Sequence, residues 1–214
     1  MKNLYKKYEL VEELIYLAKL DQEIIMREFP RIEKINDKTK QQRLYKNIAK
    51  GAHIRAQRML DILEIIKNPS IDTIGQEASE AILLITQHSY LECMKKVLSI
   101  YLDLYEKNHK SVPAHYLPSL IDRIEIIENK QQIYGTQWML DNNGVPFLIY
   151  VTDFINANKK RKKFGLDPIR KPHNLASKTN PYPLGLGLAK SEDMRQLSID
   201  DYQKYTEYYK KALI

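Results

Sequence analysis

The sequence predicts a mainly α-helical fold: a multi-helix, bundle-like single domain with one small β-hairpin at about 133–151 and a C-terminal helix. Apolar residues recur at helical spacing through most of the first 128 residues. One Asn-Gly pair lies between two runs rich in β-branched and aromatic residues, which favours a hairpin. We expect 1–170 to form the helical domain, and 171–214 to add an extended basic, Pro/Gly-rich loop and a docking helix to the same domain.

Composition narrows the class of protein. The chain has 214 residues, 43% of them hydrophobic, which is enough for one buried core. A single cysteine, Cys93, excludes an intramolecular disulfide and a Cys-based zinc site. The start MKNLYKKYEL lacks the apolar run of a signal peptide, and no apolar run approaches the ~20 residues that span a bilayer. We therefore predict a cytoplasmic protein that binds no membrane.

The first two expected helices each carry a charged residue on an apolar stripe. The first covers 3–29 and is expected to stop at Pro30. Asp21 and Gln22 fall inside its stripe, and a buried carboxylate costs several kcal/mol unless it has a partner, so we expect one for Asp21. The second helix covers 38–67, and Arg55 lies in line between Ala52 and Met59.

Three more helices are expected before the hairpin. After a linker at 70–73, a third helix ends near His88, which lies on the same face as Ile85; Ser89 marks either a kink or a break. A fourth covers 90–108. A fifth begins as late as Leu117, after Pro113, and carries Asp122 and Arg123 on its flanks.

The hairpin would pair 133–140 with 145–151 across Asn143-Gly144. Pro146 cannot donate to a strand ladder, so the second strand is an edge or begins just after it. Gly135 lies inside the first run, and we expect an irregular backbone there. A short helix at 154–164 is expected to be capped by Asp153 and to end at Gly165. Residues 165–197 are expected to form a long loop, and 198–212 the last helix.

The classical catalytic motifs are missing, and the histidines lack metal-ligand spacing, so we predict no metal and no cofactor. His88 is the best candidate acid or base, because it is the histidine on an apolar stripe. A core histidine bonded to a backbone carbonyl is the alternative. Asp122-Arg123 is either a carboxylate and a fixed cation in one pocket or an ordinary ion pair.

The block Gln132-Ile-Tyr-Gly-Thr-Gln137 is more specific, because it concentrates donors and acceptors that a strand does not need for packing. A solvent-exposed polar strand is the alternative. The basic run is either a polyanion-binding segment or a solvated cluster with Arg161 turned inward. Five consecutive helical residues point all round the axis, which argues against one contact face. The run consists of Lys159, Lys160, Arg161, Lys162 and Lys163.

Four motifs together resemble a bacterial family known only as a domain of unknown function. They are the QH pair Gln87-His88, the DR pair Asp122-Arg123, the QxYGTQ block and Arg161-x-x-x-Gly165-Leu166, with Asp21-Gln22, Arg27 and Gly75 matching as well. The resemblance covers about 10–170 and implies a mainly helical domain. It implies one functional constellation of His88, Asp122, Arg123, Tyr134, Gln137 and Arg161, without an activity.

Two functions of different kinds follow. The first is a pocket for a small anionic or amide-bearing molecule, with acid–base catalysis as an extension. Its catalytic residues would be His88, Asp122 and Arg123; its substrate-binding residues would be Gln132, Tyr134, Thr136, Gln137 and Arg161; Asp21 and Gln22 would support them. The second is a non-catalytic module that binds nucleic acid or an acidic protein through 159–171.

Overall fold

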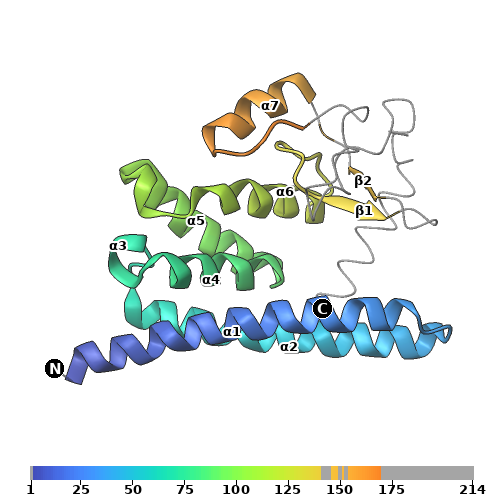
Figure 1. Ribbon diagram of the computed structural model, residues 1–214, viewed down its shortest axis with the longest axis horizontal. Helices are drawn as coiled ribbons and strands as arrows, with labels where there is room; N and C mark the ends of the chain where they lie inside the picture. The colour runs from blue at the N-terminus through green and yellow to red at the C-terminus, as the bar shows by residue number, and fades with distance from the viewer. Residues whose placement is uncertain (1, 141–145, 149–150, 152–153, 170–214) are drawn as a thin grey trace, which may run out of the picture. The chain divides into compact units, whose positions relative to one another are not determined.

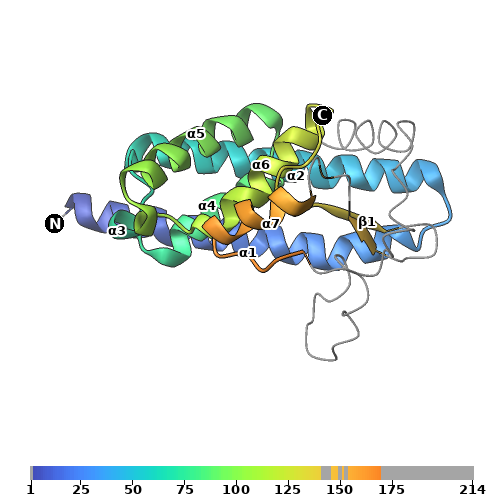
Figure 2. The ribbon, with the colours of Figure 1, turned by 90° about the horizontal axis from the view of Figure 1, so that it is seen from above.

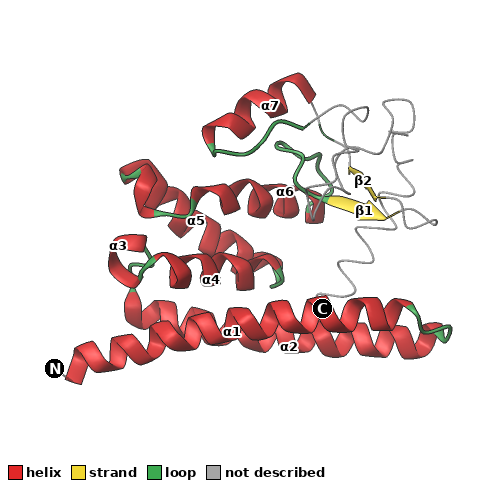
Figure 3. Cartoon of the chain, viewed as in Figure 1, coloured by secondary structure: helices red, strands yellow, loops and turns green. Residues whose placement is uncertain are grey.

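The computed structural model describes residues 2–140, 146–148, 151 and 154–169, and this part of the chain is mainly helical (Figure 3). Its residues divide into two compact units, 2–120 and 121–169. The elements are α1 (Lys2–Glu33), α2 (Lys38–Ile66), α3 (Ile71–Ile74), α4 (Gln76–Gln87), α5 (Leu91–Lys107), η1 (His109–Ser111), η2 (Ala114–Tyr116), α6 (Leu117–Ile127), β1 (Trp138–Leu140), β2 (Pro146–Leu148) and α7 (Phe154–Lys163).

The first unit is built on two long antiparallel helices, α1 and α2, which lie side by side (Figures 1 and 2). Asp37 caps α2 by accepting a hydrogen bond from the backbone of Lys40 at 3.0 Å. The predicted stop at Pro30 is wrong, because α1 continues to Glu33. Pro30 is exposed and close to the helix end, where few intrahelical bonds are lost, and the neighbouring Phe29 packs its ring 5.3 Å from Tyr45 of α2.

Helices α3, α4 and α5 complete the core of the first unit. The expected linker at 70–73 is instead the start of α3, and Gly75 separates α3 from α4. Helix α4 ends at Gln87 and a separate helix, α5, begins at Leu91. The region around Ser89 is therefore a break between two helices and not a kink in one. Fully buried side chains from several helices fill the core: Leu14, Met59, Ile62, Ile82, Leu83, Ile85, Met94, Tyr101, Leu117 and Leu120.

The unit boundary falls within α6, which begins at Leu117 as predicted. Asn129, with a φ of 61°, reverses the chain after this helix. Its backbone N–H donates to Ile126 at 3.0 Å, and that of Lys130 donates to Glu125 at 2.7 Å. This bonding pattern is a Schellman motif, which leads the chain from α6 directly into 131–137.

The hairpin predicted over 133–151 is not seen at that extent. Residues 133–137 are not a strand, and the antiparallel pairing among the described residues joins Trp138–Leu140 to Pro146–Leu148. The physical reason is local: the backbone amides of Ile133, Tyr134 and Thr136 are hydrogen-bonded to a side chain of α6, described below, so they cannot form a ladder. The Asn143-Gly144 turn lies outside the described residues.

Several other predictions also concern residues outside the described part: the Asp153 cap, the loop at 170–197 and the helix at 198–212. The predicted boundary between 170 and 171 also lies outside the described residues and stays a prediction. Across the described helices, none is both long and apolar enough to cross a bilayer.

Candidate functional site

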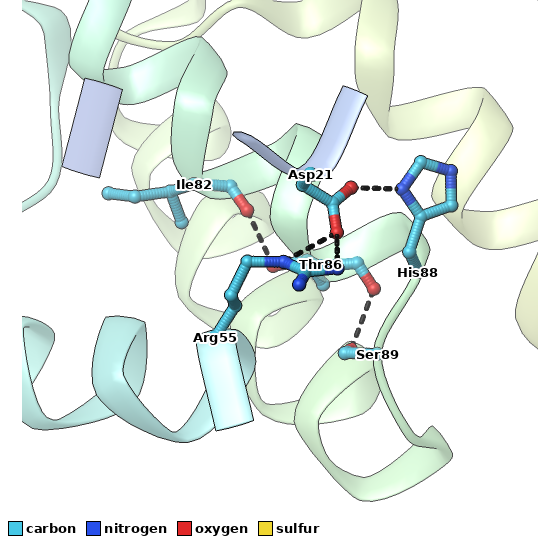
Figure 4. Close-up of polar contacts among 6 residues, drawn as sticks. All are labelled: Asp21, Arg55, Ile82, Thr86, His88 and Ser89. Atoms are coloured by element: carbon cyan, nitrogen blue, oxygen red, sulfur yellow. Dashed lines mark hydrogen bonds and ion pairs between the residues drawn. The ribbon is translucent and has the colours of Figure 1, made fainter. Parts of the chain in front are cut away.

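The first candidate site is a triad in the first unit, formed by the buried Asp21 of α1 and Arg55 of α2 and the partly exposed His88 at the end of α4 (Figure 4). Asp21 Oδ1 accepts hydrogen bonds from Arg55 Nε at 3.0 Å and Nη2 at 2.7 Å. Its Oδ2 lies 2.5 Å from His88 Nδ1. The expectation that Asp21 has a partner is confirmed: each carboxylate oxygen has its own. We call these three residues the Asp21 triad.

Helix ends and helix faces place the triad. Asp21 and Arg55 lie on the buried faces of α1 and α2, where their side chains are 0% and 8% exposed. His88 follows the last residue of α4, and its side chain is 23% exposed. Ser89 fixes this end by donating its hydroxyl to the Thr86 carbonyl at 2.7 Å (Figure 4). The imidazole of His88 is therefore bonded to the buried Asp21 through Nδ1, while part of its surface is exposed to solvent.

The charges of the triad shift the pKa of Asp21. Burial alone would raise it, but the contacts with His88 and Arg55 outweigh burial and lower the pKa of Asp21 below its ordinary value. Asp21 is therefore a carboxylate at neutral pH. A carboxylate on Nδ1 fixes the orientation and tautomer of an imidazole and makes its other nitrogen more basic.

This shift predicts how stability depends on pH. The unfolded state binds more protons than the folded state between the two Asp21 pKa values, so the contribution of Asp21 is full above about pH 4 and is lost as pH falls through the lower folded value. Arg55 and His88 are the groups that face Asp21. We expect the difference in free energy of unfolding between wild type and Asp21→Asn to shrink from pH 5 to pH 2. Urea denaturation measures it, and a constant difference would contradict the assignment.

Gln22, next to Asp21 on α1, carries an unmet hydrogen-bond donor. Its side-chain nitrogen is buried and has no hydrogen-bond partner among the described residues. Buried donors in native proteins are almost always paired with protein or water. The orphaned nitrogen is thus a place where an oxygen atom from solvent or a ligand would be stabilised.

The second candidate site lies in the second unit, where the fully buried Asp122 of α6 holds the loop 132–137. Asp122 Oδ1 accepts from the backbone of Ile133 at 2.7 Å and Tyr134 at 2.9 Å. Its Oδ2 accepts from the backbone of Thr136 at 2.9 Å and the Thr136 hydroxyl at 2.8 Å. Four donors face one carboxylate, which fits the ionised form.

The two glutamines of the block close this loop. The Gln132 amide donates to the Gln137 carbonyl at 2.9 Å and accepts from the Gln137 backbone N–H at 2.7 Å. The Gln137 side-chain oxygen accepts from Arg123 Nε at 3.1 Å and Nη2 at 2.9 Å. Gln132 and Gln137 are 0% and 8% exposed, so these bonds form away from water.

Arg161 of α7 binds the opposite side of the same loop. It is buried and donates to the carbonyls of Tyr134 at 2.9 Å and Gly135 at 3.2 Å, and to that of Asp167 at 2.6 Å. Gly135 has a φ of 65°, a left-handed conformation that favours glycine, so the irregular backbone expected there is present. The loop therefore receives an acceptor from α6 and donors from α7.

The RxxxGL block also has a local explanation. Gly165, with a φ of 69°, donates to the Lys162 carbonyl at 3.2 Å, and Leu166 donates to the Arg161 carbonyl at 3.1 Å. This is a second Schellman motif, with Gly165 at the position predicted to end the helix. It turns the chain back, so that the Asp167 carbonyl reaches the Arg161 side chain.

Burial dominates the electrostatics of this second site. It raises the pKa of Asp122 above its ordinary value, against the opposing hydrogen bonds from Tyr134, Thr136 and Ile133. Burial likewise lowers the pKa of Arg161, against the charges of Asp122 and Asp167. Both groups have hydrogen-bond partners inside the protein, which is the condition for a buried charge to be tolerated.

The predicted site residues thus form two groups. Asp21 joins His88 in the first unit, whereas the DR pair, the QxYGTQ block and Arg161 meet in the second. A constellation that includes both groups stays a prediction. Arg55 was not among the predicted site residues, although its place on an apolar stripe, opposite in charge to Asp21, was the available signal. The described contacts of Asp122, Gln132 and Arg161 hold the loop together.

No three His, Cys, Asp or Glu side chains within the described residues are arranged to hold a metal ion. No family model matches the sequence, and neither a curated protein nor a solved structure shows significant similarity to the chain. The resemblance inferred from the four motifs therefore stays a prediction, and function has to be argued from the two sites themselves.

Proposed function

We propose that the chain binds a small anionic or amide-bearing molecule at His88, with His88 able to act as a general acid or base. The observation that carries this proposal is the Asp21–His88 contact. The buried Asp21 carboxylate lies 2.5 Å from Nδ1 and orients a ring that is 23% exposed, and an imidazole oriented in this way is suited to proton transfer. Arg55 keeps the carboxylate in place from its other oxygen.

The choice of ligand class rests on Gln22. Its buried side-chain nitrogen has no partner among the described residues and would donate a hydrogen bond to an oxygen atom, which carboxylates, phosphates and amides all present. Ser89 and Thr86, the serine and threonine nearest in sequence to His88, both donate their hydroxyls to backbone carbonyls. Proton transfer by His88 therefore has more support than attack by a serine or threonine nucleophile.

In this proposal the second site has a structural role within its own unit. Asp122, Gln132, Thr136, Gln137 and Arg161 fix the loop that carries Tyr134, and Arg123 holds its far end. Direct roles for Asp122 in catalysis and for Arg123 or Arg161 in anion binding remain predictions. The internal partners of these side chains favour a structural role over ligand contact.

The test compares ligand-induced thermal shifts of the full chain for wild type, His88→Asn and His115→Gln. Asparagine keeps a donor near the position of Nδ1, so Asp21 stays paired while the titratable ring is lost. His115 is an exposed histidine of the same unit and serves as the matched control. The probes are a panel of small carboxylates, phosphate and carboxamides.

We expect at least one probe to stabilise wild type and His115→Gln equally, by about 2.7 kcal/mol at a concentration 100 times its Kd. His88→Asn should keep the unliganded melting temperature within a few degrees and lose this stabilisation. An unchanged shift in His88→Asn, or no shift of wild type by any probe, would refute the proposal.

A further inference from the structure

The burial of Arg161 fixes the rotation of α7 about its own axis. Arg161 and Ala157, one turn apart, are 6% and 1% exposed, so they mark the inward side of the helix. Lys159, Lys160, Lys162 and Lys163 are all exposed. At ~100° per residue the four lysines span about 160° of arc, and Arg161 points to the opposite side. The sequence argument against one contact face concerned all five basic residues, and with Arg161 turned inward the remaining four lysines share one face.

Contacts in the middle of α7 and at its C-terminal end hold the helix that presents this face. Asn158 accepts a hydrogen bond from the Ile169 backbone at 2.6 Å and donates to its carbonyl at 3.3 Å. Val151, Ala157 and Ile169 form a small apolar core beneath the helix. The Schellman motif at Gly165 ends the helix after the last lysine. Pre-organised charges lose less conformational entropy when they bind a partner.

The outward face has a defined composition. Within the described part of α7 it consists of Ile155, Asn156, Lys159, Lys160, Lys162 and Lys163. Ile155 is 78% exposed and is its one large apolar side chain, which is too little apolar surface for a helix that lies in a membrane interface. The face carries no aromatic side chain for stacking on bases and no arginine fork for reading base edges.

We propose that this lysine face docks the phosphate backbone of a nucleic acid, independently of the His88 site. Lysine ammonium groups bind phosphate as point charges without reading sequence, and neutralising phosphates releases condensed counterions. Lysines on adjacent turns of a helix, ~5.4 Å apart along the axis, can reach neighbouring phosphates of one strand. A surface that binds an acidic protein is expected to contain arginines and a larger apolar centre, and this face has neither.

The experiment measures fluorescence anisotropy of a labelled 20-base-pair duplex DNA, and of the corresponding duplex RNA, from 50 to 200 mM NaCl. It compares wild type with the α7 variant K159Q/K160Q/K162Q/K163Q. The matched control is K38Q/K40Q/K46Q/K50Q, which removes the same charge from exposed positions of α2. Circular dichroism and thermal melting establish that both variants are folded.

We expect wild type and the control to bind at least one duplex with a log–log salt slope of up to about −3.6, the value for four phosphate contacts. The α7 variant should bind at least tenfold more weakly, with a shallower slope. Residual binding is expected, because Arg170, Lys171, Lys178 and Lys190 remain in it. Equal loss in both variants, binding insensitive to salt, or no binding by wild type would overturn the proposal. So would tighter binding to anionic phosphatidylserine vesicles or to polyglutamate of equal charge.

Discussion

Asp122→Ala should lower the free energy of unfolding by about 3–5 kcal/mol. The substitution leaves three backbone N–H groups and one hydroxyl of the loop 132–137 without their acceptor. Each buried donor that loses its partner costs about 1–3 kcal/mol, and the loop can relax to recover part of this. Urea denaturation measures the total. Hydrogen exchange of the Ile133, Tyr134 and Thr136 amides reports the loop directly.

Two further variants separate the hydrogen bonds from charge and size. Asp122→Asn keeps one oxygen acceptor but turns an N–H₂ group toward donors, so its loss of stability should lie between zero and that of Asp122→Ala. Asp103→Ala removes an exposed carboxylate that pairs with Lys107 and should cost less than about 1 kcal/mol. If Asp122→Ala costs no more than Asp103→Ala, and the three amides stay protected, Asp122 does not hold the loop.

The Asp122 loop also shows where sequence reasoning ends. The polar residue types at 132–137 predict a ligand site, because a sequence specifies which side chains are present but not how the backbone is hydrogen-bonded. In the structure the partners of Asp122 are mainly backbone amides, which every residue carries and no residue type reveals. The positive φ of Gly135 was foreseeable from the glycine itself. The sequence did not indicate that the Asp122 carboxylate would accept the hydrogen bonds that a neighbouring strand would otherwise accept.

The Asp21 triad was more accessible to prediction. A carboxylate on the apolar stripe of α1 and a guanidinium on that of α2 each require a buried partner, and each residue type suits the other. Periodicity therefore predicts that both are paired. It does not select His88 as the second partner of Asp21, because that contact depends on where α4 ends. Helix ends are set by local capping and tertiary packing more than by periodicity.

Arg55→Met should destabilise the protein by about 3–5 kcal/mol, because it leaves the Asp21 carboxylate buried with His88 as its one remaining described partner. The double variant Asp21→Leu/Arg55→Met removes both buried charges and should recover most of that loss. His88, which is partly exposed, can then be solvated. Urea denaturation of the two single variants and the double variant gives the coupling energy of the pair.

The same two helices supply the control for burial. Arg58 of α2 contacts Glu13 of α1 with two hydrogen bonds of 2.6 and 2.7 Å, a geometry as good as that of Arg55 and Asp21. The side chains of Arg58 and Glu13 are 44% and 33% exposed, whereas those of Arg55 and Asp21 are 8% and 0% exposed. Arg58→Met should therefore cost less than about 1 kcal/mol, because water replaces the lost partner. Similar costs at the two positions would mean that hydrogen-bond geometry, and not the desolvation of Asp21, determines the stability of the triad.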